Sequence, residues 1–187
     1  MDAGILRDQL ADLSKGVFIS MPIGTVLAAL ILAVQLLSGG GLAAVAWFAA
    51  IALVNGARVV LALAQSGAAD ERQQAVVVRL SLYGLLALAS GVAWSFLALL
   101  SEGYTTAQAP LYLIMLAGTS AGSVTYCTSH APASINFITL PLLTAAACVL
   151  AQGGVENDVL GFTILLFLGG TTGANRLEPC ETSVVRM

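Results

Sequence analysis

Six long apolar blocks, separated by short polar stretches, constrain the fold of this 187-residue chain more than any other feature. A block of about 18 or more apolar residues is long enough to cross the hydrocarbon core of a bilayer as a helix. Charged residues make up only 9% of the sequence, far below the roughly 25% of a soluble domain. The chain is therefore predicted to be an all-α integral membrane bundle of six transmembrane helices. The blocks cover residues 16–37, 41–65, 76–100, 110–129, 133–151 and 159–175.

The segments outside these blocks are too short for a soluble domain. Short connections predict antiparallel neighbours within one bundle, residues 16–175. Residues 1–15 place apolar side chains along one helical stripe, which is typical of an amphipathic helix at the membrane surface or of a solvated cap to the first span. They lack the order of a signal peptide, so we expect the first span to be retained. Residues 176–187 form a short tail.

The basic residues predict the orientation of the bundle. With six spans, all seven Lys and Arg fall on the side that holds both termini, and the opposite side carries only acidic residues. Positively charged loops remain in the cytoplasm. Both termini are therefore expected to be cytoplasmic, in a multi-pass protein of the inner (cytoplasmic) membrane. The basic residues are Arg7, Lys15, Arg58, Arg72, Arg79, Arg176 and Arg186, and the opposing acids are Glu102, Glu156 and Asp158.

Composition argues against several other classes of protein. The net charge of −3 is small and dispersed, so nucleic-acid binding is not expected. The three cysteines show no C-x-x-C spacing, which argues against a disulfide framework or a zinc site. His130 and Cys127 could share a helix face, but the chain has no second histidine to complete a metal or haem site. We therefore expect no metal and no cofactor.

The stretch GTSAG, residues 118–122, matches the G-x-S-x-G pattern of serine hydrolases. That pattern requires a strand before the serine, and here it lies within an apolar block. On one helix Ser120 and His130 would be about 15 Å apart, whereas a nucleophile and its base need roughly 3 Å. The only lysine, Lys15, lies at the start of the first span. No catalytic residue is therefore predicted.

Helix packing is the alternative role of this stretch. Gly118 and Gly122 form a G-x-x-x-G step, which Thr125 and Ser129 continue along the same stripe. Small residues at this spacing let two helix backbones approach closely in lipid. A second step of this kind lies in the sixth block, at Gly169 and Gly173. We expect the two faces to pack on each other, or either one to form a homodimer contact.

Three further residues are candidates for a ligand-binding or switching role. His130 precedes Ala-Pro in the turn between the fourth and fifth blocks, where its charge would change near neutral pH. Asn136 is a candidate for a buried polar contact in the fifth block. Pro141 frees a backbone carbonyl one turn earlier and can bend the helix, either to shape a ligand cavity or simply to fit the bundle.

Asn55 and Arg58 lie three residues apart near the cytoplasmic end of the second block. A charge inside a membrane is costly and often functional, but an arginine this close to the surface is expected to extend toward the headgroups. All acidic residues lie in predicted loops or tails, and the two three-span halves show no repeat. These features argue against ion-coupled transport.

Two sequence runs carry a resemblance to a known family. They are YLIMLAGTSAGSVTYCTSHAPASINFITLPLLTAAACVLAQGG and GFTILLFLGGTTGANRLE. Together they resemble the multi-span N-terminal sensory region of bacterial GGDEF and GGDEF–EAL proteins. In that region a glycine-rich helix, a short turn, an alanine-rich helix with Phe and Pro, and a final span lead into a cytoplasmic output domain. Arg79 and Trp94 in the third block are similar to that family as well.

The resemblance implies a membrane sensory or signal-input module with no catalytic residues of its own. Its partners would be membrane lipid, a second copy of the chain, and a fused or separate cytoplasmic GGDEF or EAL output domain. The sequence ends at Met187 without an output domain, so we expect either a truncated signalling protein or a bundle that acts on a partner. The predicted mechanism is a shift in packing at the small-residue faces of the fourth and sixth blocks, passed on near Arg176. A small transporter or channel-like protein is the alternative.

Overall fold

The computed structural model describes residues 3–64, 73–126 and 131–181, with side chains for 16–64, 74–123 and 134–173. All regular secondary structure in these residues is α-helical, which confirms the predicted all-α class. The helices are α1 (Ala3–Leu37), α2 (Leu42–Leu63), α3 (Gln73–Ser95), α4 (Leu97–Leu100), α5 (Ala109–Tyr126), α6 (Ala131–Ala151) and α7 (Val155–Glu181). α3 and the short α4 follow each other along one rod, interrupted at Phe96.

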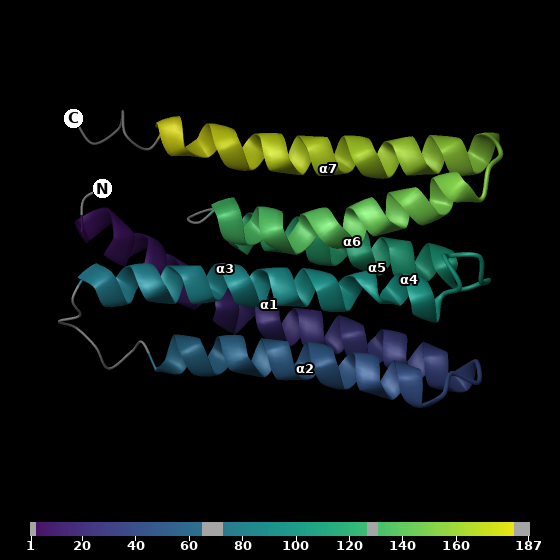
Figure 1. The fold of residues 1–187 in the computed structure, drawn as a ribbon, viewed down its shortest axis with the longest axis horizontal. Helices are drawn as coiled ribbons and strands as arrows, with labels where there is room; N and C mark the ends of the chain where they lie inside the picture. Colours follow the sequence, from purple (N-terminus) through teal and green to yellow (C-terminus); the bar gives the residue numbers. More distant parts are fainter. Residues whose placement is uncertain (1–2, 65–72, 127–130, 182–187) are drawn as a thin grey trace.

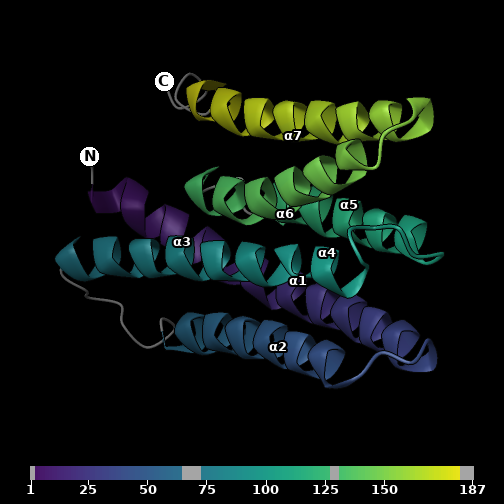
Figure 2. The ribbon, with the colours of Figure 1, turned by 45° about the vertical axis from the view of Figure 1, so that its right-hand side comes forward.

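The helices run alternately up and down through one bundle (Figure 1). α1 begins, and α7 ends, at the same end of the bundle, which we call the terminal end. The connections 38–41, 101–108 and 152–154 lie at the opposite end, the loop end. α3 and α6 pack together at the centre, α1 and α2 lie on one side, and α7 lies at the outer edge beside α6 (Figure 2).

The first helix joins two segments that the sequence separates. α1 runs for 35 residues from Ala3 and includes both the N-terminal segment and the first apolar block. Pro22 lies inside it without ending it. The N-terminal segment is therefore continuous with the first span from Ala3 onward.

Four helices are long and apolar enough to cross a membrane, as expected for a membrane protein. They are Gly16–Leu37, Leu42–Leu63, Gln74–Leu100 and Ser134–Ala151. Over the described residues, α5 and α7, which contain the fourth and sixth apolar blocks, are not among them. Large apolar side chains such as Leu53, Ile114 and Leu166 are more than two-thirds exposed, and lipid would be the natural environment of such a surface.

A pair of tryptophans lies in the core where α2 meets α3. The rings of Trp47 and Trp94 meet edge to face, with centroids 5.7 Å apart. The indole N–H of Trp47 donates a hydrogen bond of 2.8 Å to the carbonyl of Ala93. This bond satisfies the one polar atom of a buried ring, so it fixes how α2 lies against α3.

α3 and α6 approach most closely at Gly91. Because Pro141 has no N–H, the helix cannot hydrogen-bond the carbonyl of Phe137 four residues earlier. This carbonyl lies against α3, where a Cβ on Gly91 would be 2.7 Å from the Phe137 oxygen and 3.0 Å from the Asn136 oxygen. Only glycine fits against backbone at that distance. The proline-freed carbonyl is thus covered by the glycine of the neighbouring helix.

Three glutamines fasten the connections at the loop end. The side-chain amide of Gln35 donates to the carbonyl of Leu100 at 3.1 Å, and that of Gln108 donates to the Ser38 hydroxyl at 3.2 Å. Gln152 donates to the carbonyl of Gly103 at 2.7 Å. These bonds tie each connection at this end to another part of the chain.

The connection from α4 to α5 holds three consecutive left-handed residues. Glu102, Gly103 and Tyr104 have φ angles of 50°, 74° and 66°. Such angles cost little at glycine but on the order of 1–2 kcal/mol at other residues. Tyr104 is buried here, and this burial raises the pKa of its phenol.

Candidate functional site: a polar cavity among five helices

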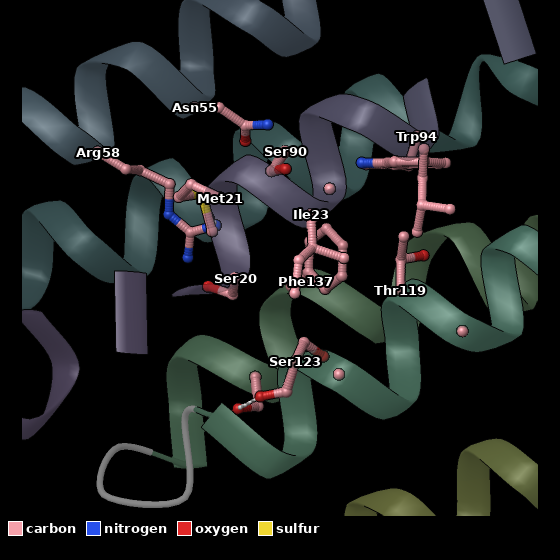
Figure 3. Close-up of a pocket in the computed structure, with 15 residues that line it drawn as sticks. Ser20, Met21, Ile23, Asn55, Arg58, Ser90, Trp94, Thr119, Ser123 and Phe137 are labelled. Atoms are coloured by element: carbon pink, nitrogen blue, oxygen red, sulfur yellow. Dashed lines mark hydrogen bonds between the residues drawn. The ribbon is translucent and has the colours of Figure 1, made fainter. Parts of the chain in front are cut away.

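A cavity of about 70 Å³ lies among α1, α2, α3, α5 and α6 (Figure 3). A single water needs on the order of 10–15 Å³ on this measure, so the space holds several waters or one small molecule. Five hydroxyl side chains from four helices converge on it. They are Ser20, Ser90, Thr119, Ser123 and Ser134.

α2 contributes the amide and the charge of the cavity. Asn55 and Arg58 are only 6% and 5% exposed, and both line it. They continue the inward stripe of α2, which also carries Trp47 and Ile51 at helical spacing. The expectation that Arg58 extends to the membrane surface is therefore wrong, because its place on this stripe directs it into the bundle.

The guanidinium of Arg58 reaches the end of the cavity near α1. Figure 3 shows it extending toward Met21 and Ser20, and its Nη1 donates to the Met21 sulfur at 3.7 Å. Tyr83 of α3 lies close enough to both Arg58 and Arg79 for their charges to act on its hydroxyl. The positive charge is therefore held among α1, α2 and α3.

Asn55 is held in place by α1. Its Nδ2 donates to the hydroxyl of Thr25 at 2.9 Å, and that hydroxyl donates to the carbonyl of Met21 at 2.8 Å. The chain of two bonds orients the amide at the cavity wall. A buried polar residue on a membrane helix is stabilised by contacts of this kind between helices.

The rest of the wall is apolar and aromatic. Ile23 and Leu27 come from α1, Trp94 from α3 and Phe137 from α6. Trp94 is 2% exposed and is braced by Trp47. The cavity thus has a charged, hydroxyl-bearing end and an aromatic side, which is typical of sites that bind small molecules.

The glycine-rich stretch of α5 faces this cavity. Gly118, Thr119 and Gly122 line it, and a Cβ at either glycine would meet no described atom within 4 Å. Within the described chain, no helix backbone presses against these glycines. The space beside these two glycines is therefore open among the described residues. Ser123 accepts a hydrogen bond at its carbonyl from the Ser134 hydroxyl at 3.2 Å, which joins α5 to α6 beside the cavity.

Ser120, the serine of GTSAG, does not line the cavity. It is fully buried, and its hydroxyl has no hydrogen-bond partner among the described residues. Ser129 and His130 lie outside the described residues, as does the side chain of Thr125. The predicted contact of this stripe with a second copy therefore stays a prediction.

The glycines of the sixth block also have open space beside them. A Cβ on Gly169 or Gly173 would meet no described atom within 4 Å. The close approach of α7 to α6 is instead at Gly161, where a Cβ would be 2.5 Å from Cγ of Leu150. Sequence reasoning missed this glycine because it stands alone, outside a G-x-x-x-G step.

Asn136 lies in the α3–α6 contact, and Pro141 lies five residues farther along α6. Asn136 is half-buried, and its Nδ2 would be 3.9 Å from a Cβ on Gly84. Pro141 is fully buried, and α6 continues through it. Neither lines the cavity, but Phe137, whose carbonyl the proline frees, does. Gly84 and Gly91 are seven residues apart on α3, and this two-turn spacing was the sequence signal for their shared face.

In the described part of the chain, no three His, Cys, Asp or Glu side chains lie close enough together to hold a metal ion. The groups that line the cavity are one guanidinium, one amide, five hydroxyls and apolar side chains. Comparison of the chain with protein-family models, with curated proteins and with solved structures found no match.

Proposed function

We propose that this chain is a non-catalytic signal-input module of a bacterial inner membrane, whose cavity senses a small ligand. The observation that carries the proposal is the cavity itself, with a buried charge and an aromatic wall among five helices. The sequence resemblance to the input region of GGDEF and GGDEF–EAL proteins supports a signalling role. A cytoplasmic output domain of that class, fused or separate, is the partner that it implies.

The proposed topology has six passes with both termini in the cytoplasm. The helices alternate in direction and bring both chain ends to one end of the bundle. α5 has 18 residues, about 27 Å at roughly 1.5 Å per residue, close to the ~30 Å core of a bilayer. Arg58 and Arg79 lie toward the terminal end, and Glu102, Glu156 and Asp158 lie at the loop end. This separation of charge supports a cytoplasmic terminal end.

The proposed signal is a change in helix packing. A ligand in the cavity would touch the glycine stretch of α5 and Phe137 of α6. α6 packs along α7, the helix that ends at the terminal end. A displacement of α6 would therefore move the end of α7, where an output domain would be attached. Ligands shift such an equilibrium only by binding its two states with different affinity.

An output fusion tests this function. A diguanylate cyclase domain placed after Met187 would report the state of the bundle. Gly118→Leu places a large side chain at a residue that lines the cavity, whereas Gly56→Leu places the same side chain at an exposed glycine of α2 that does not line it. A Cβ at either position meets no described atom within 4 Å. We expect Gly118→Leu to change cyclic-di-GMP output several-fold at equal membrane abundance and Gly56→Leu to leave it unchanged. Equal output from both variants would reject the signalling proposal.

Transport is the second candidate, and the convergence of polar side chains inside the bundle favours it. Flux of a small solute into vesicles that contain the purified chain would separate the two functions. Sustained flux that Gly118→Leu abolishes would support transport over sensing. The buried position of Ser120 is consistent with a non-catalytic role, and labelling of this residue by a serine-reactive probe would contradict it.

A further inference from the structure

Two hydroxyl groups that line the cavity already donate their protons within α5. The Thr119 hydroxyl donates to the carbonyl of Leu116 at 2.9 Å. The Ser123 hydroxyl donates to the carbonyl of Ser120 at 2.8 Å. A hydroxyl that has given its proton still has lone pairs with which to accept a hydrogen bond. These two groups are therefore acceptors toward a ligand.

The side-chain amide of Asn55 adds a third acceptor. Its Nδ2 donates to the Thr25 hydroxyl at 2.9 Å, and the amide oxygen can accept. Figure 3 shows this oxygen on the side of the amide that faces Ser90, which also lines the cavity. Asn55 and Ser90 are only 6% and 2% exposed, so a ligand that reaches this oxygen must enter the bundle.

Ser20 offers the cavity a donor. Its hydroxyl is buried and has no hydrogen-bond partner among the described residues. A buried hydroxyl without a partner costs free energy, and this cost is removed when a ligand accepts its hydrogen bond. The lining therefore favours a ligand group that both donates and accepts, as an alcohol hydroxyl does.

The lining also favours an uncharged ligand. None of the described residues that line the cavity is Asp or Glu, so a cation would be buried there without a counter-charge, which is costly. An anion would bring its lone pairs against those of Thr119, Ser123 and Asn55. Arg58 already interacts within the chain, and it is not counted among the groups that recognise the ligand.

The rest of the wall selects for a carbon chain. Leu27, Trp94 and Phe137 present apolar surface to the cavity. Water would leave this surface without an apolar partner, whereas an alkyl group would bury it. The volume of about 70 Å³ limits that group to a few carbon atoms.

We propose that the cavity binds a small neutral alcohol, whose hydroxyl is recognised by the lining hydroxyls and the Asn55 amide and whose carbon chain lies against Trp94 and Phe137. This assignment rests on the proposed function, since it takes the same cavity as the ligand site. It goes further in naming the class of the ligand. Thr119, Ser123 and Asn55 accept from the alcohol, and Ser20 donates to it.

Tryptophan fluorescence tests this directly, because the chain has only two tryptophans. Trp94 lines the cavity and Trp47 contacts its ring, and both are almost fully buried. Bromine quenches indole fluorescence on contact, so a brominated ligand must enter the bundle to quench it. The full chain in lipid nanodiscs is titrated with bromopropanol, with its isomer bromoethyl methyl ether, and with bromopropionate, each carrying bromine on a terminal carbon.

We expect saturable quenching by bromopropanol, and affinities about fivefold or more weaker for the ether, which cannot donate, and for the charged bromopropionate. Equal affinities for bromopropanol and the ether would overturn recognition of the hydroxyl. Bromopropionate binding as tight as bromopropanol or tighter would overturn the preference for a neutral ligand. No saturable quenching by bromopropanol would overturn the proposal.

Variants locate the site. Thr119→Val and Ser123→Ala, combined in one chain, remove two acceptors with little change of shape, so the preference for bromopropanol over the ether should fall several-fold while binding of the ether is kept. Gly118→Leu is expected to abolish quenching by both, and Gly56→Leu, at an exposed glycine that does not line the cavity, to preserve it. Quenching of Gly118→Leu as in the unchanged chain would place the site elsewhere and overturn the proposal. An unchanged preference in the combined variant would overturn the assigned acceptors, and this comparison holds even if Gly118→Leu fails to fold.

The source of the hydroxyl is tested with bromododecanol. It carries the same hydroxyl on a chain that the cavity is too small to enclose, as a lipid of the bilayer would. Tighter binding of bromododecanol than of bromopropanol, at equal concentrations within the lipid, would overturn the small-ligand assignment.

The two proposals fail in different ways. Saturable binding of bromopropanol without any effect on the fused cyclase would reject signal input and retain the alcohol site. A change of cyclase output in Gly118→Leu without bromopropanol binding to the unchanged chain would do the reverse.

Discussion

Adding one methyl group at Gly91 is expected to weaken the central contact of the bundle. The Cβ of Gly91→Ala would lie 2.7 Å from the carbonyl oxygen of Phe137 and 3.0 Å from that of Asn136. Ordinary contacts of a Cβ begin at 3.4 Å, about 0.7 Å farther than the first of these distances. Both obstructing atoms belong to the α6 backbone, so no side chain can rotate away. α3 and α6 must therefore separate.

The size of the effect follows from two opposing terms. An alanine stabilises a helix interior by about 0.5–1 kcal/mol relative to glycine. Inserting a group into a closely packed contact costs about 1–3 kcal/mol. Gly84→Ala is the matched control, since it lies on the same helix and its Cβ would only touch the Asn136 amide at 3.9 Å. Both variants gain the same helix stabilisation from replacing glycine with alanine. The difference between their free energies of unfolding therefore measures the cost of the steric clash with α6.

Equilibrium unfolding in mixed micelles, followed by far-ultraviolet circular dichroism, measures this difference. We expect Gly91→Ala to have a free energy of unfolding about 1–3 kcal/mol lower than Gly84→Ala. Equal stabilities would show that α3 and α6 do not meet as closely as the structure places them. A Gly91→Ala variant more stable than the unchanged chain would refute the reasoning outright.

Three other perturbations address other parts of the structure. Trp47→Phe removes the hydrogen bond to Ala93 while keeping a ring, and thermal unfolding should show a loss of about 0.5–1.5 kcal/mol; no loss would mean that the bond is replaced. Gln152→Ala removes the bond to Gly103, and amide hydrogen exchange in 101–108 should accelerate, whereas unchanged exchange would contradict a fastening role. Because burial raises the pKa of Tyr104 above its ordinary value of 10.0, the unfolded state ionises first, so stability is unaffected below pH 10 and falls above it. The melting temperature measured as a function of pH reports this loss of stability, and the loss above pH 10 should be smaller in Tyr104→Phe. An identical pH profile in that variant would show that Tyr104 is not its cause.

The helices could be predicted because hydropathy is a property of continuous sequence. The fifth block, 133–151, corresponds closely to α6 (Ala131–Ala151). The sixth block missed the beginning of α7, which starts at Val155 and includes Glu156 and Asp158. Carboxylates are favourable at a helix N-terminus, where the backbone N–H groups are unpaired. A purely apolar criterion therefore places this boundary too late.

The cavity could be predicted only in part, because it depends on how helices from distant parts of the sequence face one another. The sequence predicts a buried polar contact for Asn136, which lies half-buried against α3 at Gly84, and a bend at Pro141 that shapes a cavity or fits the bundle. Pro141 is fully buried inside α6 and does not line the cavity. The inward position of Arg58 could have been read from its spacing to Trp47 and Ile51 on the same stripe. Which stripe faces inward is decided by neighbouring helices, and so is the role of a lone glycine such as Gly91.

The glutamine hydrogen bonds hold the loop end of the bundle in place, so motions of the helices are expected to be smallest there and largest at the terminal end. With the connections there tied to one another, a helix that tilts must swing about that end, and its displacement grows along its length. α7 continues to Glu181 at the terminal end, and 27 residues at roughly 1.5 Å each make it about 40 Å long, so a tilt of a few degrees at the loop end becomes a shift of a few ångströms at the terminal end. The stiffness of the loop end would thus determine how far the terminal end moves.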